Sequence, residues 1–574
     1  MVPALNPMSQ ATPESTVIRR LADLRSVSLI LKKSRQTPLQ ICRAVIEGRI
    51  IDLKTSAFFA GLPADEKYYW LSSLYTLLMP EARRRKLAAY FTPPHLAEYA
   101  INRIAQAGVR LGQDRILDPA SGGAAFLLPL ASRIANSAQR ASDSPETILK
   151  KIESSLYGVE IDPGLSLLSK MLLNDLLKDH IRSAGRKPNI SITQEDTLTL
   201  DPQPVLFDAV IGNPPYGRIL QPSKKLLKNF APVISDGYVN LYALFLEQSL
   251  RFTKPGGVIA LVVPMSFLGG PYFANLRRRI LTHADVLSLD PVDKRSDVFL
   301  DVLYDVCILT LQKKQNKRSA PAPTCSLLTT ARPHRCLGKL ELPRAASGDV
   351  WALPDGERNE NLFQAGLETL SDYGYVARTG YFVWNREKER YRVGRKPRKS
   401  EVPLFWAHNV KPGELCRPYD DGEDSTLIGF VKFKNDNTTP VIRNDAVILQ
   451  RTSNRRQPRR LIAAIARLSK VPGKRGFITE NHTIVIVRIQ KRPPAVSLSV
   501  LCRLINTAAV DARFRRISGS VSVSTKALNQ LPLPAADHVR TLFIADADDE
   551  RAAAACYTRS TAVSKKLSRA AAAG

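Results

Sequence analysis

The residues best suited to chemistry in this sequence lie together at positions 213–216, which read Asn-Pro-Pro-Tyr. They follow an apolar run, residues 207–212, that is typical of a β-strand, and the two prolines stiffen the loop by fixing φ. The Asn213 side-chain oxygen and the Pro214 carbonyl can accept both hydrogens of an amino group on a planar ring, against which Tyr216 can stack. Holding both hydrogens draws the nitrogen lone pair out of conjugation and directs it at an electrophilic methyl group. The pattern predicts an amino-methylation site, and the alternative is a merely structural proline-stiffened turn.

Three other strand ends carry small or acidic residues. Asp118, Ala120 and Gly122 belong to a small-residue turn from a strand into a helix, where backbone can approach a ligand closely. Glu160 follows the second strand, where a carboxylate can accept two hydrogen bonds from a ribose diol, and Asp196 follows the third, where it can bind an adenine amino group. Each turn alone could be tight packing or a solvated acid, but together they indicate a nucleoside-bearing cofactor. The separation of Asp118 from Glu160 exceeds the roughly 20 residues of a dinucleotide fold, which argues against NAD.

The elements that must position these residues alternate between short apolar runs and helical stretches. Such alternation predicts an α/β fold with a doubly wound, mostly parallel sheet, whose ligands bind beyond the carboxyl ends of the strands. Helical periodicity over about residues 15–85 predicts a helical N-terminal extension, in which we find no chemistry. The expected strands cover residues 115–118, 155–160, 190–193, 207–212, 257–263 and 302–311.

Residues 312–324 lose this periodicity and gather Lys, Pro and Ala, which is typical of a linker. We therefore expect three parts: a helical extension over 1–85, a catalytic domain over 86–315 and a basic α+β target-recognition domain over 316–574. Of the 83 Lys+Arg and 53 Asp+Glu in the chain, 46 and 24 lie in residues 313–574, which leaves that segment a net charge of +22 of the total +30. A charge this large and this localised suits nucleic acid, because binding neutralises phosphates and releases counterions.

A basic run in the C-terminal part covers residues 451–460, and we take it as the candidate DNA contact. The alternative is a solvated face with no ligand. The arginines of the run are Arg451, Arg455, Arg456, Arg459 and Arg460.

Several classes of protein are excluded by composition. The seven cysteines are scattered and never spaced as C-x-x-C, which argues against a zinc knuckle, against a disulfide framework and for a reducing cytoplasm. We expect no metal. The best apolar run, residues 258–263, is far shorter than the roughly 20 residues that span a bilayer, and the first residues lack a signal-peptide pattern, so we expect no membrane anchor.

The order of these motifs over about residues 90–311 resembles that of the γ-class amino-methyltransferases, the class of the TaqI-like N6-adenine DNA methyltransferases. It begins with Tyr-Phe-Thr-Pro-Pro at residues 90–94, and the resemblance implies that Thr92 contacts the methionine moiety of the cofactor. By the same resemblance Phe245 packs on the cofactor adenine, and Phe299 stacks on the face of the target base opposite Tyr216. One departure is Ala124, where the family usually has a second loop glycine, and it affects the shape of that loop.

The resemblance implies a class I S-adenosylmethionine-dependent fold and methyl transfer from S-adenosylmethionine to N6 of an adenine swung out of duplex DNA. It also implies the modification enzyme of a type II restriction-modification system, acting as a monomer, with a separate endonuclease for the same site as a candidate partner. Enzymes that methylate N4 of cytosine usually carry Ser or Asp in place of Asn213. The remaining alternatives are methylation of RNA or of a protein glutamine, and a catalytically silent DNA-binding specificity protein.

Overall fold

The computed structural model divides into two compact units, which are described separately below. Unit 1 comprises Met1–Met265, Asn275–Leu340 and Arg344–Gly348, and unit 2 comprises Ser266–Ala274, Glu341–Pro343 and Asp349–Gly574. The structure describes residues 13–87, 92–201, 206–235, 237–293, 305–315, 321–329, 334–344, 347–356, 362–363, 366–417, 427–433, 440–452, 457–518 and 522–572.

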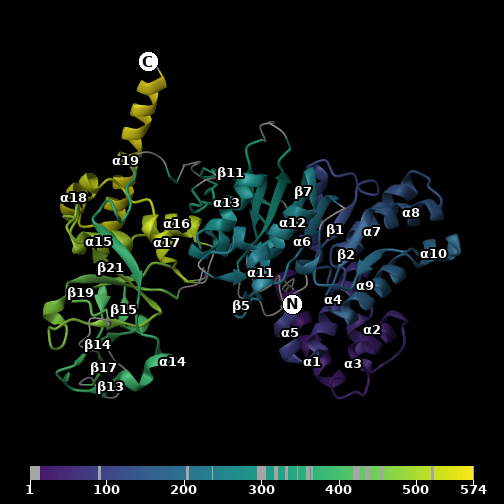
Figure 1. The fold of residues 1–574 in the computed structure, drawn as a ribbon, viewed down its shortest axis with the longest axis horizontal. Helices are drawn as coiled ribbons and strands as arrows, with labels where there is room; N and C mark the ends of the chain where they lie inside the picture. The colour runs from purple at the N-terminus through teal and green to yellow at the C-terminus, as the bar shows by residue number, and fades with distance from the viewer. Residues whose placement is uncertain are drawn as a thin grey trace, which may run out of the picture. The chain divides into compact units, whose positions relative to one another are not determined.

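The centre of unit 1 is a nine-stranded sheet of order β11-β10-β8-β9-β7-β4-β1-β2-β3. Strands β7, β1 and β2 of this sheet are labelled in Figure 1. Strands β3, β2, β1, β4 and β7 run parallel, whereas β9 is antiparallel to β7 and to β8. The strands are β1 Ile116–Asp118, β2 Leu156–Val159, β3 Ser191–Thr193, β4 Phe207–Gly212, β7 Thr253–Pro264, β8 Ala284–Pro291, β9 Val306–Lys313, β10 Thr324–Leu327 and β11 Arg335–Lys339. The predicted doubly wound, mostly parallel α/β fold is therefore confirmed.

Helices connect the parallel strands. Such a helix packs on the sheet through a face on which apolar residues recur. In α7, Leu127, Leu130, Ala131 and Ile134 are buried, at the i, i+3, i+4 and i+7 spacing of a helix that packs on a sheet. The helices of this part are α6 Pro94–Gln106, α7 Leu127–Arg140, α8 Pro145–Ser155, α9 Pro163–Leu176, α10 Lys178–Ala184, α11 Lys224–Asn229, α12 Leu241–Phe252 and α13 Ala274–His283. The parallel strands end at one edge of the sheet, where the predicted site residues follow them.

Unit 1 extends past the boundary expected near residue 315. Strand β10 pairs with β8 in parallel and with β11 antiparallel, so the chain after the linker adds two strands to the edge of the sheet. Residues 316–320 of the expected linker lie outside the described residues, and the two strands after it are too short to show periodicity of their own. The assignment of the three segments to extension, catalysis and target recognition stays a prediction.

The N-terminal part of unit 1 is helical, as the periodicity predicted. Its helices are α1 Pro13–Leu31, α2 Pro38–Ile46, α3 Leu53–Phe59, α4 Ala64–Leu78 and α5 Glu81–Leu87. Helix α4 is buried on most of its surface and packs against α1, α2, α6 and α9. The extension therefore shares its core with the helices that follow the sheet strands.

Unit 2 contains two four-stranded sheets and a group of helices. One sheet has the order β12-β21-β18-β19 and the other β13-β17-β14-β20. The first sheet and the helices enclose a common apolar core, which includes Tyr375, Leu449, Ile484 and Phe514. The elements are β12 Tyr375–Thr379, α14 Trp384–Glu387, β13 Tyr391–Gly394, β14 Glu401–Phe405, β17 Ile428–Lys432, β18 Ala446–Gln450, β19 Ala463–Ala466, β20 Ile478–Thr479, β21 Thr483–Arg488, α15 Leu498–Ile505, α16 Ala508–Ile517, α17 Thr525–Asn529, α18 Ala536–Ala545 and α19 Asp549–Ala572.

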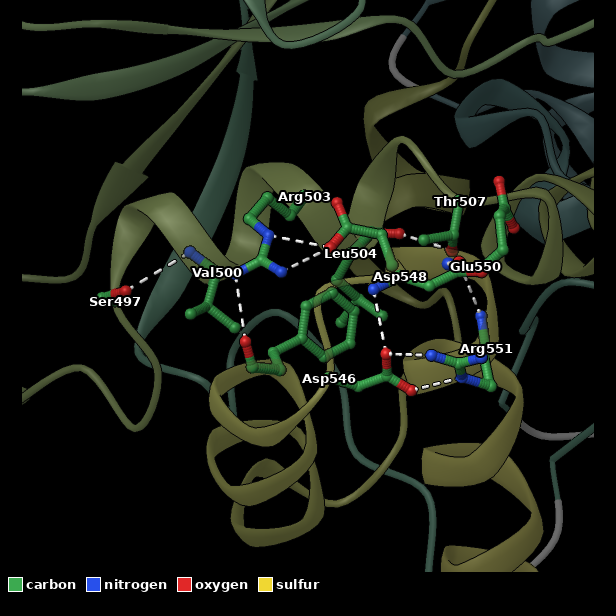
Figure 2. A network of polar contacts seen from close by, with 11 residues as sticks. Ser497, Val500, Arg503, Leu504, Thr507, Asp546, Asp548, Glu550 and Arg551 are labelled. Atoms are coloured by element: carbon green, nitrogen blue, oxygen red, sulfur yellow. Dashed lines mark hydrogen bonds and ion pairs between the residues drawn. The ribbon is translucent and has the colours of Figure 1, made fainter.

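A polar network joins α15 to the connection between α18 and α19 (Figure 2). Arg503 donates from Nε and Nη2 to Oδ1 of Asp549, at 2.8 and 2.5 Å, and from Nη1 to the Phe543 carbonyl at 3.1 Å. Arg551 donates to both carboxylate oxygens of Asp546, at 2.6 and 2.7 Å. Part of the positive charge of unit 2 is thus engaged with carboxylates of the same unit.

Two kinds of feature are absent from the part of the chain that the structure describes. None of the helices there is both long and apolar enough to cross a membrane. The same residues include no group of three or more His, Cys, Asp or Glu side chains that could hold a metal ion.

Candidate functional site

A cavity of about 250 Å³ lies in unit 1 among the turns that follow β1, β2, β3 and β4. The ionisable residues that line it, among those described, are all carboxylates: Glu160, Glu195 and Asp196. Such a lining favours a ligand with hydroxyl, amino or cationic groups over one with phosphates. The cavity brings together Thr92, Ala120, Gly122, Glu160, Asp196, Asn213 and Phe245 from the predicted site.

The turn after β1 places backbone rather than side chains toward the cavity. Asp118 is fully buried, and its Oδ1 accepts a hydrogen bond from the Ala120 N–H at 3.1 Å. Burial, with a smaller contribution from the nearby Glu160 charge, raises the pKa of Asp118 to about 8. Asp118 does not line the cavity, so its place in the structure is that of a support for the turn.

Two residues of the same turn have a positive φ, and one of them is Ala124, which stands where the resembling family usually has a glycine. Gly122 has φ of 52° and Ala124 has φ of 63°, both in the left-handed region. Glycine adopts this conformation without strain, whereas a residue with a Cβ does so at a cost. Ala124 therefore adopts a left-handed backbone conformation at the expense of local backbone strain.

Glu160 is held by backbone N–H groups on both of its oxygens. Its Oε2 accepts from Gly122 and its Oε1 from Asp162, each at 2.8 Å. Burial raises the pKa of Glu160 to about 7, although these two hydrogen bonds favour the charged form and oppose the rise. Because each carboxylate oxygen has a second lone pair, the side chain can still accept two hydrogen bonds from a diol in the cavity.

Glu160 is supported by Asp162, a residue that the sequence analysis did not single out. Asp162 is buried and caps α9 by accepting from the N–H groups of Gly164 and Leu165, both at 3.0 Å. The same carboxylate accepts from the Tyr75 hydroxyl at 3.1 Å and from Arg83 Nη2 at 2.5 Å. The Asp-Pro pair at the start of α9 could have indicated the cap, but nothing in the sequence pairs it with the N-terminal helices.

The helical extension also lines a second cavity, of about 350 Å³, which shares Thr92 and Ala125 with the first. Tyr68, Tyr69 and Ser72 of α4 contribute to its wall. Ser72 Oγ donates to the carbonyl of Gly123 in the turn after β1, at 3.2 Å. The N-terminal helices therefore contact two of the three cofactor turns.

Asp196 and Phe245 line the cavity from the other turns. Asp196 caps the short helical turn Thr197–Thr199 by accepting from the Leu198 N–H at 3.0 Å, and Thr197 Oγ1 donates to the Pro119 carbonyl. Phe245 lies on α12 and is 7% exposed. A carboxylate and an aromatic ring in one cavity can bind the edge and the face of a purine.

The Asn213-Pro-Pro-Tyr segment follows β4 directly, as predicted. Asn213 and Pro215 line the cavity, whereas Pro214 and Tyr216 are buried. The Tyr216 hydroxyl lies 2.5 Å from Asn213 Oδ1 and 3.1 Å from the Val262 carbonyl, and burial raises its pKa well above the usual value, so it remains a donor. The ring meets Tyr242 edge-on at 6.4 Å. Stacking of Tyr216 on a target ring stays a prediction, because its ring does not line this cavity.

Phe299 lies outside the described residues, so its predicted role is untested. Arg455 and Arg456 also lie outside them. Among the remaining arginines of the basic run, Arg460 is fully buried, with its guanidinium 5.6 Å from the centre of the Phe514 ring. Arg459 pairs with Glu550 at 2.6 Å, and Arg451 donates to the Asn481 carbonyl at 2.9 Å. The burial of Arg460 corrects its assignment as a DNA contact, since an interior guanidinium cannot reach a phosphate.

The residues around the first cavity fit a nucleoside-bearing cofactor with a methionine end. Thr92 Oγ1 and Ser121 Oγ are buried in its lining and have no hydrogen-bond partner among the described residues. Buried polar atoms are nearly always paired, so these two mark positions where a ligand can supply the missing hydrogen bonds.

Known proteins similar to this chain in sequence include type II methyltransferases. Residues 154–299 match the family model described as Eco57I restriction-modification methylase. The chain is 23% identical over 471 residues to the type II methyltransferase M.BsuBI of Bacillus subtilis, covering 79% of this chain and 89% of that protein. It is 22% identical over 360 residues to the type II methyltransferase M.PstI of Providencia stuartii, covering 58% and 66%. The predicted resemblance to type II modification methyltransferases is confirmed by these similarities.

Among solved structures, the chain is similar to the Type IIL restriction-modification enzyme MmeI in complex with DNA. The TM-score is 0.53 at 12% identity, over 94% of this chain and 91% of that one. At this identity the likeness concerns the fold, and it extends through both units of the chain.

Proposed function

We propose that this chain is a site-specific DNA methyltransferase of a restriction-modification system, which transfers a methyl group from S-adenosylmethionine to N6 of adenine. The observation that carries the proposal is the position of Asn213. It follows β4 at the edge of a cavity that also holds Glu160, Asp196 and Phe245. An amino-group acceptor is thus adjacent to a nucleoside-binding site.

Each part of the cofactor has residues suited to it. Glu160 accepts hydrogen bonds from the ribose hydroxyls, Asp196 binds the adenine amino group, and Phe245 packs on the adenine ring. Thr92 and Ser121 supply hydroxyl groups near the methionine end, and Gly122 lets the backbone approach there. The bound cofactor supplies an electrophilic methyl group, and the carboxylate lining suits its positive sulfonium.

At the other side of the site, the protein binds the target amino group. Asn213 Oδ1 and the Pro214 carbonyl would accept its two hydrogens, and this leaves the nitrogen lone pair free to face the methyl carbon in line with its bond to sulfur. The nitrogen–carbon bond would form as that carbon–sulfur bond breaks, and the sulfur would leave as a neutral thioether. The proton leaves the nitrogen after it has gained positive charge, so a strong general base is not required. Catalysis depends mainly on positioning and electrostatics.

The amino group of adenine is inside the duplex stack, so the target nucleotide must leave it at a cost of a few kcal/mol. Tyr216 and Phe299 would compensate by stacking on the extruded base. By this proposal the chain acts as a monomer and as the modification component, with cleavage at the same site performed by a separate endonuclease. The similarity to M.BsuBI over 89% of that methyltransferase supports this division.

The test is to incubate the purified full-length chain with isotope-labelled S-adenosylmethionine and duplex DNA, and to identify the labelled nucleoside by mass spectrometry. We expect N6-methyladenine at one short sequence. Label found only in N4-methylcytosine would contradict the choice of adenine. Label found only in RNA or in a protein glutamine, or none despite cofactor binding, would contradict the proposed function.

A further inference from the structure

Unit 2 contains a group of aromatic side chains close to its surface, which we call the aromatic cluster: Trp384, Tyr391, Trp406 and His408. The rings of Trp384 and Trp406 are 5.6 Å apart, and that of Tyr391 is 5.0 Å from Trp384 and 5.9 Å from Trp406. His408 lies parallel to Trp406, at 14° and 6.3 Å. The cluster is therefore a set of rings in mutual contact rather than one isolated aromatic residue.

One tryptophan of the cluster, Trp384, is far more exposed to solvent than the buried tryptophans of the chain. Trp384 is 40% exposed, whereas Trp70 and Trp351 are 3% and 0% exposed. Tyr391 and Trp406 pack against a small apolar core of the second sheet, but Trp384 is not part of that core. A large ring held in place by its neighbours, yet left half open to water, is typical of a binding surface.

A basic groove begins in the same segment of chain. It has a volume of about 750 Å³ and is lined by Arg378, Arg443 and Arg488, all of which are exposed. Among the described residues that line it, Asp445 is the only carboxylate, and its Oδ1 already accepts from the Leu468 N–H at 2.8 Å. A groove with three exposed guanidinium groups and one engaged carboxylate suits a polyanion.

The groove and the cluster are adjacent in the chain. Residues 378–381 line the groove, and Phe382 and Trp384 follow them directly in the chain. The Tyr381 hydroxyl, in the groove wall, accepts from Arg390 Nη1 at 3.5 Å, and Phe382 lies 6.4 Å from the cluster residue Tyr391. Through Tyr381 and Arg390, the groove wall therefore contacts the segment that carries Tyr391.

We propose that the basic groove and the aromatic cluster form one DNA-binding surface, in which the arginines contact phosphates and Trp384 and Trp406 contact bases or sugars. Positive grooves give affinity through the phosphate backbone, and in a duplex the apolar faces of Trp384 and Trp406 can pack on sugars and on the edges of bases. This inference rests on the proposed function in one respect, that the partner is duplex DNA. It replaces the basic run at 451–460 as the main contact of this unit.

The four tryptophans allow a direct test with the full-length protein. Because Trp70 and Trp351 are buried, quenching of tryptophan fluorescence on titration with duplex DNA should come from Trp384 and Trp406. Trp384→Phe combined with Trp406→Phe should remove most of the quenching. The matched control, Trp70→Phe, should keep it.

Affinity and salt dependence test the two halves separately. Trp384→Ala should weaken DNA binding on the order of tenfold, because a large apolar ring no longer packs against the duplex, while its melting curve stays close to that of the wild type because Trp384 is outside the apolar core. Arg378→Ala, Arg443→Ala and Arg488→Ala should each reduce the slope of log affinity against log salt by about 0.9 for each phosphate that the variant no longer neutralises.

The outcomes separate this inference from the proposed function. If the wild type methylates DNA, and Trp384→Ala and the groove variants bind DNA with unchanged affinity, quenching and salt slope, the surface is wrong and the function stands. If the wild type binds DNA with quenching that depends on Trp384 but never methylates it, the surface stands and the function is wrong. Quenching by single-stranded RNA but not by duplex DNA would overturn the choice of partner.

Discussion

The residues of the predicted cofactor site in unit 1 lie together, whereas those described of the predicted DNA contact in unit 2 include a buried side chain. Seven predicted residues of unit 1 line one cavity, although they come from six segments of the chain between Thr92 and Phe245. In unit 2 the basic run at 451–460 is contiguous in sequence, yet Arg460 is buried and Arg459 is paired. Nearness in the chain was thus a poorer guide than position relative to a strand.

The reason is topological. In a parallel sheet the carboxyl ends of successive strands meet at one edge, so a residue that follows a strand is placed as soon as the strand is recognised. A run of arginines in an irregular segment has no such constraint, and each side chain points where its own backbone and neighbours direct it. Composition gives the sign of the charge of unit 2 but not which charges face a ligand.

The largest expected effect is the loss of methyl transfer when Asn213 is replaced. It tests whether a residue that follows a strand in this sheet is catalytic. Asn213→Ala should reduce methyl transfer by about 10²–10³-fold, because it removes one of two acceptors that stabilise the reacting amino group. Cofactor affinity, measured by calorimetric titration, should stay within a few fold of the wild type. If Asn213→Ala retains turnover, the residues that follow β4 form a structural turn and not a catalytic site.

Next in size is the loss of the ribose acceptor. Glu160→Gln should weaken S-adenosylmethionine binding by roughly 10- to 150-fold, equivalent to the 1.5–3 kcal/mol of a charged hydrogen bond. Asp65→Asn changes a carboxylate that lines only the second cavity and is the matched control. An affinity of Glu160→Gln equal to that of the control would remove Glu160 from the site.

The raised pKa of Glu160 adds a dependence on pH. Since burial raises it to about 7, cofactor affinity at pH 6 should be about tenfold lower than at pH 8, and Glu160→Gln should remove this dependence. Stability of the free protein changes in the opposite sense. A raised carboxyl pKa stabilises the fold below the unfolded pKa near 4.5, and this contribution is lost as pH rises through 7.

It follows that Glu160→Gln should raise the melting temperature of the ligand-free protein above pH 7 and should change it little at pH 4. Scanning calorimetry at the two pH values measures this. A melting temperature lowered at pH 8 would mean that the carboxylate stabilises the apo fold and that its pKa is not raised.

The sequence predicted six of the nine strands of the sheet and the position of Glu160 and Asp196 after two of them, because each depends on local periodicity and on the strand that precedes it. Strand β8 was not among the expected strands. It did not predict the contact of Tyr75 with Asp162, since 87 residues separate them and no pattern links the N-terminal helices to α9. The hairpin β10–β11 was missed for a related reason, as an edge pairing between short strands leaves little trace in composition. Side-chain direction, as at Arg460, is fixed only by packing.

A smaller effect tests the support behind Glu160. Tyr75→Phe removes one hydrogen bond to Asp162, worth about 1 kcal/mol, and should weaken cofactor binding a few fold while leaving the turnover of bound substrate unchanged. Arg83→Ala should act in the same direction. Tyr69→Phe, on the same helix and in the wall of the second cavity, is the control. Loss of turnover with unchanged affinity would show that the extension acts on chemistry instead.

The smallest effect on DNA binding is expected for Arg459, which belongs to the basic run predicted from the sequence as the DNA contact. Arg459 is held by Glu550 at 2.6 Å with both side chains partly exposed, an arrangement worth at most about 1 kcal/mol to stability. Arg459→Ala should therefore leave both DNA affinity and the salt slope within error, whereas Arg378→Ala in the groove should flatten the slope. Both can be measured by fluorescence anisotropy of labelled duplex DNA between about 50 and 200 mM salt, a range over which each neutralised phosphate is resolved as a slope change of about 0.9. If Arg459→Ala flattened the slope by that amount and Arg378→Ala did not, Arg459 would leave its ion pair in the complex. Contiguity of charge in the sequence would then be the better guide to the DNA contact after all.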